Sequence, residues 1–259
     1  MTGQGREKFD GLGRDYDRYR PRYPSALFDA VVSALPAVER PWAIDTGAGT
    51  GVALEGLLRA RPDWARLDAV DVSSDMVARG REKFPQVEWH VGAAEPFLES
   101  NPGAHLILAA QAYQWMDRPR YVRAAADGLA AGGVVAIMQN DRDFTVNRFL
   151  DAYEGLLEEL SPGYSRFYRT FDIGAELGER FATVEEHRVV WEQRMRADDF
   201  VGMSQTSTQV QRAITAHGGE FLRRLEELVG SHAVEGELTL TYTSKVFTAT
   251  SPHGAARSS

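Results

Sequence analysis

The sequence predicts an α/β fold in which a doubly wound, mostly parallel sheet carries an antiparallel edge strand and a helical cap. First, short apolar runs alternate with amphipathic stretches through the first half of the 259 residues, as in successive βαβ units. Second, the first apolar run leads through three alternating glycines into a helical pattern, which is typical of a ligand-binding turn. Third, residues 183–195 and 237–250 alternate in polarity, as antiparallel edge strands do. The predicted architecture is Rossmann-like.

The alternation of apolar runs and amphipathic stretches in the first half of the sequence predicts individual strands and helices. The run from Ala104 to Ala110 is continuously apolar, so we expect a strand covered on both faces. Ser74 can cap a helix that Pro85 then ends, and Gly132 and Gly133 are expected to turn the chain into the last parallel strand. Strands are expected at 42–46, 67–71, 87–91, 104–110 and 134–139, and helices at 52–60, 74–84 and 120–129.

The second half loses this rhythm and is rich in aromatic residues. We interpret 141–182 and 196–232 as elements of a helical cap, with a helix at 209–229. The tail 251–259 is expected to be disordered because it consists mainly of small and polar residues. The length favours one domain over 1–250, made of an N-terminal segment (1–35), a ligand-binding core (36–140), the cap elements and two terminal strands (183–195 and 237–250).

The composition limits the partners and the location. A formal charge of -8 and a pI near 5.3 disfavour a surface that tracks phosphates, so no nucleic acid partner is expected. No apolar stretch approaches the roughly 20 residues that cross a bilayer, and residues 1–10 are too polar for a secretory signal, so we expect neither membrane nor export. The absence of cysteine favours a cytoplasmic location, and the histidines lack metal-ligand spacing, so no metal is expected. The sequence leaves the oligomeric state open.

The most specific motif is the segment 44–51, which reads Ile-Asp-Thr-Gly-Ala-Gly-Thr-Gly. Glycines permit positive φ and a close approach of the backbone to a ligand, and the helix that follows offers unpaired N–H groups to a carboxylate. Asp45 can accept a hydrogen bond from an ammonium group. A nicotinamide fingerprint would need a glycine where Val52 stands. Asp71 ends the next strand, where a carboxylate accepts hydrogen bonds from ribose hydroxyls, so an adenosine-containing ligand is implied.

Several segments together carry a family resemblance. They are 45–51, 70–76, 92–97 and 110–115, preceded by the arginine- and tyrosine-rich segment 16–24. With these motifs the sequence resembles class I methyltransferases that bind S-adenosyl-L-methionine, and within them the small-molecule branch that includes trans-aconitate methyltransferase-like enzymes. The resemblance implies transfer of the methyl group to an oxygen, nitrogen or carbon atom of a small molecule by in-line displacement. Bacterial secondary metabolism is one setting for such an enzyme.

The resemblance also implies residue roles. The loop around Gly47 would hold the methionine part, Asp71 the ribose, and Val72 and Met76 one face of the adenine. The family usually has Asp where this chain has Ala93. The implied cofactor-binding residues are Tyr16, Arg20, Asp45, Gly47, Ala48, Gly49, Asp71, Val72, Met76, Ala93, Ala94 and Gln111. The implied acceptor pocket contains Tyr19, Tyr113 and Trp115, and the concentration of aromatic residues in the cap adds Phe167 and Tyr168 to it. Residues 1–35 would then form a lid over the cofactor, and no residue is assigned as a catalytic acid or base.

Two alternatives stay open at this point. A nicotinamide-dependent oxidoreductase would share the adenosine-binding logic, although Val52 and the antiparallel tail disfavour it. A methyltransferase-fold protein that binds the cofactor without transferring the methyl group would carry the same motifs, because fold and binding motifs do not by themselves establish a reaction.

Overall fold

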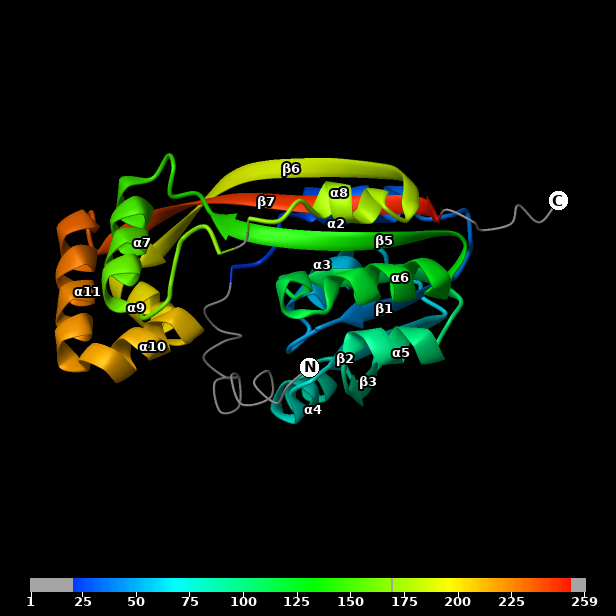
Figure 1. The fold of residues 1–259 in the computed structure, drawn as a ribbon, viewed down its shortest axis with the longest axis horizontal. Helices are drawn as coiled ribbons and strands as arrows, with labels where there is room; N and C mark the ends of the chain where they lie inside the picture. The colour runs from blue at the N-terminus through cyan, green and yellow to red at the C-terminus, as the bar shows by residue number, and fades with distance from the viewer. Residues whose placement is uncertain (1–20, 169, 253–259) are drawn as a thin grey trace.

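The computed structural model describes residues 21–168 and 170–252 (Figure 1). The predictions made for Tyr16, Tyr19 and Arg20, and for the tail from residue 253, lie outside the described residues.

One seven-stranded sheet organises the molecule, in the order β3-β2-β1-β4-β5-β7-β6. Neighbouring strands from β3 to β5 are parallel, whereas β7 runs antiparallel to both β5 and β6. The predicted fold class is therefore confirmed. The strands are β1 (Trp42–Thr46), β2 (Arg66–Asp71), β3 (Glu88–Val91), β4 (Ala104–Ala110), β5 (Leu129–Arg142), β6 (Phe181–Arg196) and β7 (Glu237–Pro252).

Helices cover both faces of the sheet and give three layers. On one face, apolar side chains of α2 (Ser25–Ser33), α3 (Val52–Ala60) and α4 (Ser74–Lys83) form one core with the strands. On the other face, α5 (Ala94–Ser100), α6 (Arg118–Gly128) and α8 (Ile173–Gly178) form a second core. Burying one apolar face of each helix in this way is the main source of their stability.

The cap is a separate helical layer beyond one end of the sheet (Figure 1). It consists of α7 (Arg148–Leu160), α9 (Ala197–Gln205), α10 (Thr208–His217) and α11 (Gly219–His232). These helices share a third core with Leu238, Leu240 and Tyr242 of β7. The long strands β6 and β7 therefore belong to the sheet at one end and to the cap at the other, which fixes the cap relative to the strand ends of the sheet.

Several element predictions need correction. The single helix expected at 209–229 is two helices, because Gly218 adopts a positive φ of 56° between α10 and α11. The helix α8 lies in the range assigned to the cap, but its apolar side chains pack on the sheet. Gly132 and Gly133 do not precede a strand but lie inside β5, where the register with β4 shifts. Strand β7 continues to Pro252, opposite Phe181, so residues 251–252 belong to the sheet.

The helices α2 and α5 were not expected from the sequence, because their nine and seven residues fall short of the roughly 11–18-residue window in which a helical period can be recognised. Among the described residues, no helix combines the length and the apolar character needed to cross a membrane.

Candidate functional site

A cavity of about 920 Å³ lies between the carboxyl ends of the parallel strands and the cap. In an open parallel sheet this edge is where ligands bind, because loops leaving neighbouring strands diverge there. One side of the cavity is built by the loops that follow β1, β2, β3 and β4. The other side is built by the end of β5, by α7, by residues 164, 166–168 and 170, and by residues from the end of α9 to the start of α10.

The glycine loop joins β1 to α3 in the left-handed conformations that the sequence implied. Gly47, Gly49 and Gly51 have φ values of 65°, 56° and 85°. The N–H groups of Gly47 and Ala48 donate to the carbonyl oxygen of Val70, at 2.8 and 3.1 Å, and so attach the loop to β2. A Cβ atom added at Gly49 would meet no atom within 4 Å, whereas one added at Gly47 would lie 2.4 Å from the Cβ of Ala112. The backbone at Gly49 is therefore open to a ligand.

This difference predicts unequal effects of two matched substitutions on stability. Gly47→Ala combines left-handed strain with a collision against Ala112 and should lower the free energy of unfolding by about 3 kcal/mol. Gly49→Ala meets only the strain and should lower it by about 1 kcal/mol. Urea denaturation of both variants without ligand measures these values, and equal losses would show that the contact with Ala112 has no effect.

Asp71, at the end of β2, ties the glycine loop to the next loop. Its Oδ2 accepts the N–H of Gly49 and its Oδ1 accepts the N–H of Ser73, both at 2.9 Å. Burial raises the pKa of Asp71 above its usual value, although these two backbone hydrogen bonds act in the opposite direction. Each carboxylate oxygen has a second lone pair that a ligand hydroxyl can use.

Asp45, in β1, is a buried carboxyl group beside this loop. Only 2% of the residue is exposed, and within residues 21–168 and 170–252 neither of its oxygens has a hydrogen-bond partner. Burial, reinforced by the charge of Asp71, raises the pKa of Asp45 to about 8. A nearby cation would stabilise the ionised form of such a buried carboxyl group. Because Asp45 also lines the cavity, its environment fits a ligand that carries an ammonium group.

The loop after β4 separates two aromatic residues that were both expected in the acceptor pocket. The short helix η2 (Tyr113–Trp115) directs Trp115 to the cavity, where 44% of the residue is exposed. The prediction for Tyr113 is corrected: its ring packs among Tyr121 and Phe171, its hydroxyl donates to Glu176 at 2.6 Å, and it does not line the cavity. Because η2 is a tight 3-10 turn, the side chains of Tyr113 and Trp115 point in different directions. Neither the period of a strand nor that of an α-helix predicts this difference.

Gln111 is a strained residue at the same strand end. It is not a glycine, yet its φ is 55°. Its backbone N–H donates to the carbonyl of Met138 at 2.9 Å, and its side-chain amide donates to the carbonyl of Asn140 at 2.7 Å. Its own carbonyl accepts the side-chain amide of Gln114 at 2.9 Å. Such strain persists only where surrounding contacts hold it, and here they hold Gln111 in the cavity wall.

The structure brings the remaining predicted site residues within its range to this cavity. The residues concerned are Ala48, Val72, Met76, Ala93, Ala94, Phe167 and Tyr168. Phe167 and Tyr168 are 60% and 43% exposed, which places apolar surface on the cap side. Among the lining residues that were not predicted are Arg142 at the end of β5 and Glu154 on α7, which form an ion pair of 3.0 Å. No local pattern indicates this pair, because β5 was expected to end at 139.

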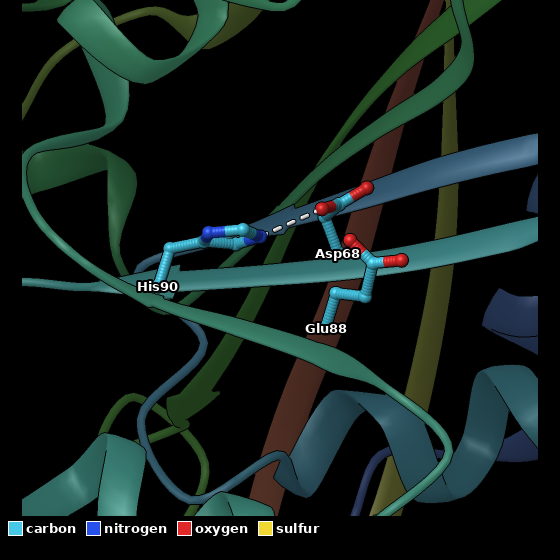
Figure 2. A group of neighbouring side chains, drawn as sticks. All are labelled: Asp68, Glu88 and His90. Atoms are coloured by element: carbon cyan, nitrogen blue, oxygen red, sulfur yellow. Dashed lines mark hydrogen bonds and ion pairs between the residues drawn. The ribbon is translucent and has the colours of Figure 1, made fainter.

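A second polar group lies away from the cavity, on β2 and β3 (Figure 2). Asp68, Glu88 and His90 place possible metal-ligand atoms within 4.8 Å of one another. However, Asp68 accepts hydrogen bonds from Nε2 of His90 at 2.7 Å and from the indole of Trp42 at 2.6 Å, and pairs with Arg66 at 2.7 Å. A metal would have to displace a guanidinium from a buried carboxylate, so we interpret the group as a structural network.

Comparison with known proteins shows which chains share this architecture and these motifs. Residues 43–133 match the family model described as a methyltransferase domain, and this range contains the glycine loop, Asp71 and the loop after β4. A methyltransferase from Anaeromyxobacter dehalogenans, described as type II, has a solved structure with a TM-score of 0.69 and 26% identity. The match covers 90% of this chain and 98% of that chain.

Curated relatives point the same way. An uncharacterised methyltransferase of Mycobacterium tuberculosis is 26% identical over 217 residues, which is 84% of this chain and 83% of the relative. A trans-aconitate 2-methyltransferase of Rhodopseudomonas palustris is 30% identical over 119 residues, which is 43% of each chain. These relatives favour methyl transfer over the nicotinamide-dependent alternative.

Proposed function

We propose, from the premise that this chain is a class I methyltransferase with S-adenosylmethionine as its methyl donor, that it methylates an oxygen, nitrogen or carbon atom of a small molecule. The observation that carries the proposal is one continuous cavity of about 920 Å³, which runs from the glycine loop to the aromatic cap. This volume is near the upper end of small-molecule sites, about 300–1,000 Å³, so it leaves room for a cofactor and an acceptor together.

In the cofactor half of the cavity, each polar group would contact a particular part of the cofactor. We place the methionine part against the open backbone of Gly49, with its ammonium group near the buried carboxyl of Asp45. The ribose hydroxyls use the remaining lone pairs of Asp71. Val72 and Met76 line the cavity where the adenine would pack, and Ala94, in the first turn of α5, offers its N–H group to the base.

The acceptor half supplies positioning and excludes water. When bound, S-adenosylmethionine supplies an electrophilic methyl carbon attached to a positively charged sulfur. Positive charge on the sulfur is lost as the methyl group is transferred, so an apolar wall with little water favours the transition state. Trp115, Phe167 and Tyr168 provide that wall. Holding the nucleophile close to the methyl carbon contributes the larger part of the rate enhancement, and we assign no side chain as acid or base.

A small molecule is the acceptor that the chemistry favours. The net charge of -8 is unsuited to a nucleic acid, whose phosphates need clustered lysine and arginine. Relatives with a named substrate, such as the Rhodopseudomonas palustris protein, are trans-aconitate 2-methyltransferases. We place the protein in bacterial small-molecule metabolism, with secondary metabolism as the setting to be examined first.

The proposal is tested with S-adenosylmethionine labelled in its methyl group. Purified protein is incubated with this cofactor and a fractionated small-molecule extract from bacteria, and the products are separated by chromatography. We expect label in a small organic product, and much less of it with the Asp71→Ala variant at a cofactor concentration that does not saturate this variant. Label that stays in the cofactor, from protein that binds S-adenosylhomocysteine, would favour the alternative that the cofactor is bound without methyl transfer.

A further inference from the structure

The cap end of the cavity contains a charged pair to which the proposed function gives no role. Nη2 of Arg142 lies 3.0 Å from Oε1 of Glu154, and the hydroxyl of Tyr164 donates to the other carboxylate oxygen. The Glu154 side chain is only 5% exposed. Both oxygens of this buried carboxylate therefore have partners, as a buried charge requires.

Arg142 has more binding capacity than this pair uses. A guanidinium carries five N–H donors on three nitrogens, and Glu154 engages only Nη2. One face of the guanidinium lies over the ring of Tyr153, with 4.8 Å between Cζ and the ring centroid. The side chain is 26% exposed and lines the cavity. Apart from its contacts with Glu154 and Tyr153, no hydrogen bond of the Arg142 guanidinium is found within the described residues, so its remaining donors are available to a ligand group that only accepts hydrogen bonds.

Arg166 offers an internal comparison, because it also lines the cavity. Its Nη1 lies 2.6 Å from Asp151 and its Nε lies 2.8 Å from Glu158. Two carboxylates thus neutralise this guanidinium, whose side chain is only 15% exposed. Among the cavity-lining residues in the described part of the chain, Arg142 and Arg166 are the two with cationic side chains. Arg142, with one carboxylate, is the one that suits an additional anion.

We propose that Arg142 binds an oxyanion of the methyl acceptor, a carboxylate or a phosphate, at the cap end of the cavity. This inference rests on the proposed function and specifies its substrate class. The cavity wall also includes Phe144, Met203 and Tyr242, which suit an acceptor with an apolar or aromatic part. A guanidinium matches carboxylate and phosphate geometry through two parallel hydrogen bonds, which orients the acceptor as well as binding it.

Three aromatic probes test the proposal on protein saturated with S-adenosylhomocysteine: benzoate, phenyl phosphate and the uncharged benzamide. Calorimetry should show that at least one anion binds the wild type at least about tenfold more tightly than benzamide. The stronger anion distinguishes a carboxylate from a phosphate. Arg142→Gln should reduce this preference below about threefold, Arg142→Lys should keep part of it, and Arg166→Gln should keep it in full.

Two controls keep the result interpretable. Arg142→Gln leaves Glu154 buried without its cation, so the double variant Arg142→Gln/Glu154→Gln supplies a neutral pair if the single variant does not fold. Binding of S-adenosylhomocysteine reports the integrity of the cofactor site in every variant. Equal binding of benzamide and both anions by the wild type, or an anion preference that survives in a folded protein without Arg142, would overturn the proposal. Failure of the wild type to bind S-adenosylhomocysteine would contradict the proposed function itself.

Discussion

Replacing Asp71 by alanine is expected to weaken the binding of S-adenosylhomocysteine by at least about 100-fold. The carboxylate holds the N–H groups of Gly49 and Ser73, and in our assignment it also accepts the ribose hydroxyls. Hydrogen bonds to a charged group contribute about 1.5–3 kcal/mol each, and two lost interactions of this size correspond to roughly 100-fold or more in the dissociation constant. Asp71→Asn keeps the shape but replaces one acceptor by a donor, so its effect should be intermediate.

A nearby acid provides the control for this prediction. Asp75 lies in the first turn of α4, pairs with Arg79 at 3.5 Å and does not line the cavity. Asp75→Ala should therefore change the dissociation constant by less than about twofold, because partly exposed ion pairs contribute little. Isothermal titration calorimetry measures both variants. Asp71→Ala binding as well as Asp75→Ala would remove Asp71 from the cofactor site.

The affinity for S-adenosylhomocysteine should fall about tenfold for each pH unit below about 8. In the protein without ligand, burial and the neighbouring Asp71 raise the pKa of Asp45 to about 8, so its carboxyl group is mostly protonated at pH 7. The ammonium group of the ligand favours the ionised carboxylate. Binding at pH 7 therefore releases close to one proton from Asp45. Above pH 8 the carboxyl group is already mostly ionised before binding, so little proton is released.

Calorimetry in two buffers of different ionisation enthalpy measures this proton directly between pH 6 and pH 9. The variant Asp45→Asn cannot ionise, so its affinity should be lower at pH 8 and should not vary across this range. If the affinity of Asp45→Asn depended on pH as steeply as that of the wild type, the titrating group would be a residue other than Asp45. The proposed contact between Asp45 and the ammonium group of the ligand would then be contradicted.

The cofactor half of the site could be predicted because its chemistry is encoded locally. The requirement for positive φ at Gly47 and Gly49 restricts those positions to residues without a side chain. The position of Asp71 follows from the end of an apolar strand, and β1, α3 and β4 have the predicted bounds. In each case a few consecutive residues determine the conformation, so the sequence alone is informative.

The acceptor half of the site could be predicted only in part, because its residues are brought together by strand pairing and helix packing between segments far apart in the sequence. Arg142 reaches the cavity since β5 continues beyond residue 139 by pairing with β7, and Tyr242 stands directly opposite it. Its partner Glu154 comes from a helix whose position depends on the third core. Tyr113 and Trp115 differ in position because of one tight turn. The concentration of aromatic residues predicted that Phe167 and Tyr168 line the acceptor pocket, and both line the cavity, but it gave no indication of Arg142 or Glu154.

The most direct test of the central claim is a crystal structure of the protein with S-adenosylhomocysteine. We predict the ribose at Asp71, the amino acid part along Gly47 to Gly49, and the sulfur directed toward the half of the cavity that contains Trp115 and Arg142. A ligand bound elsewhere, or bound with its adenosine in the cap, would contradict the assignment of the two halves and the function derived from it.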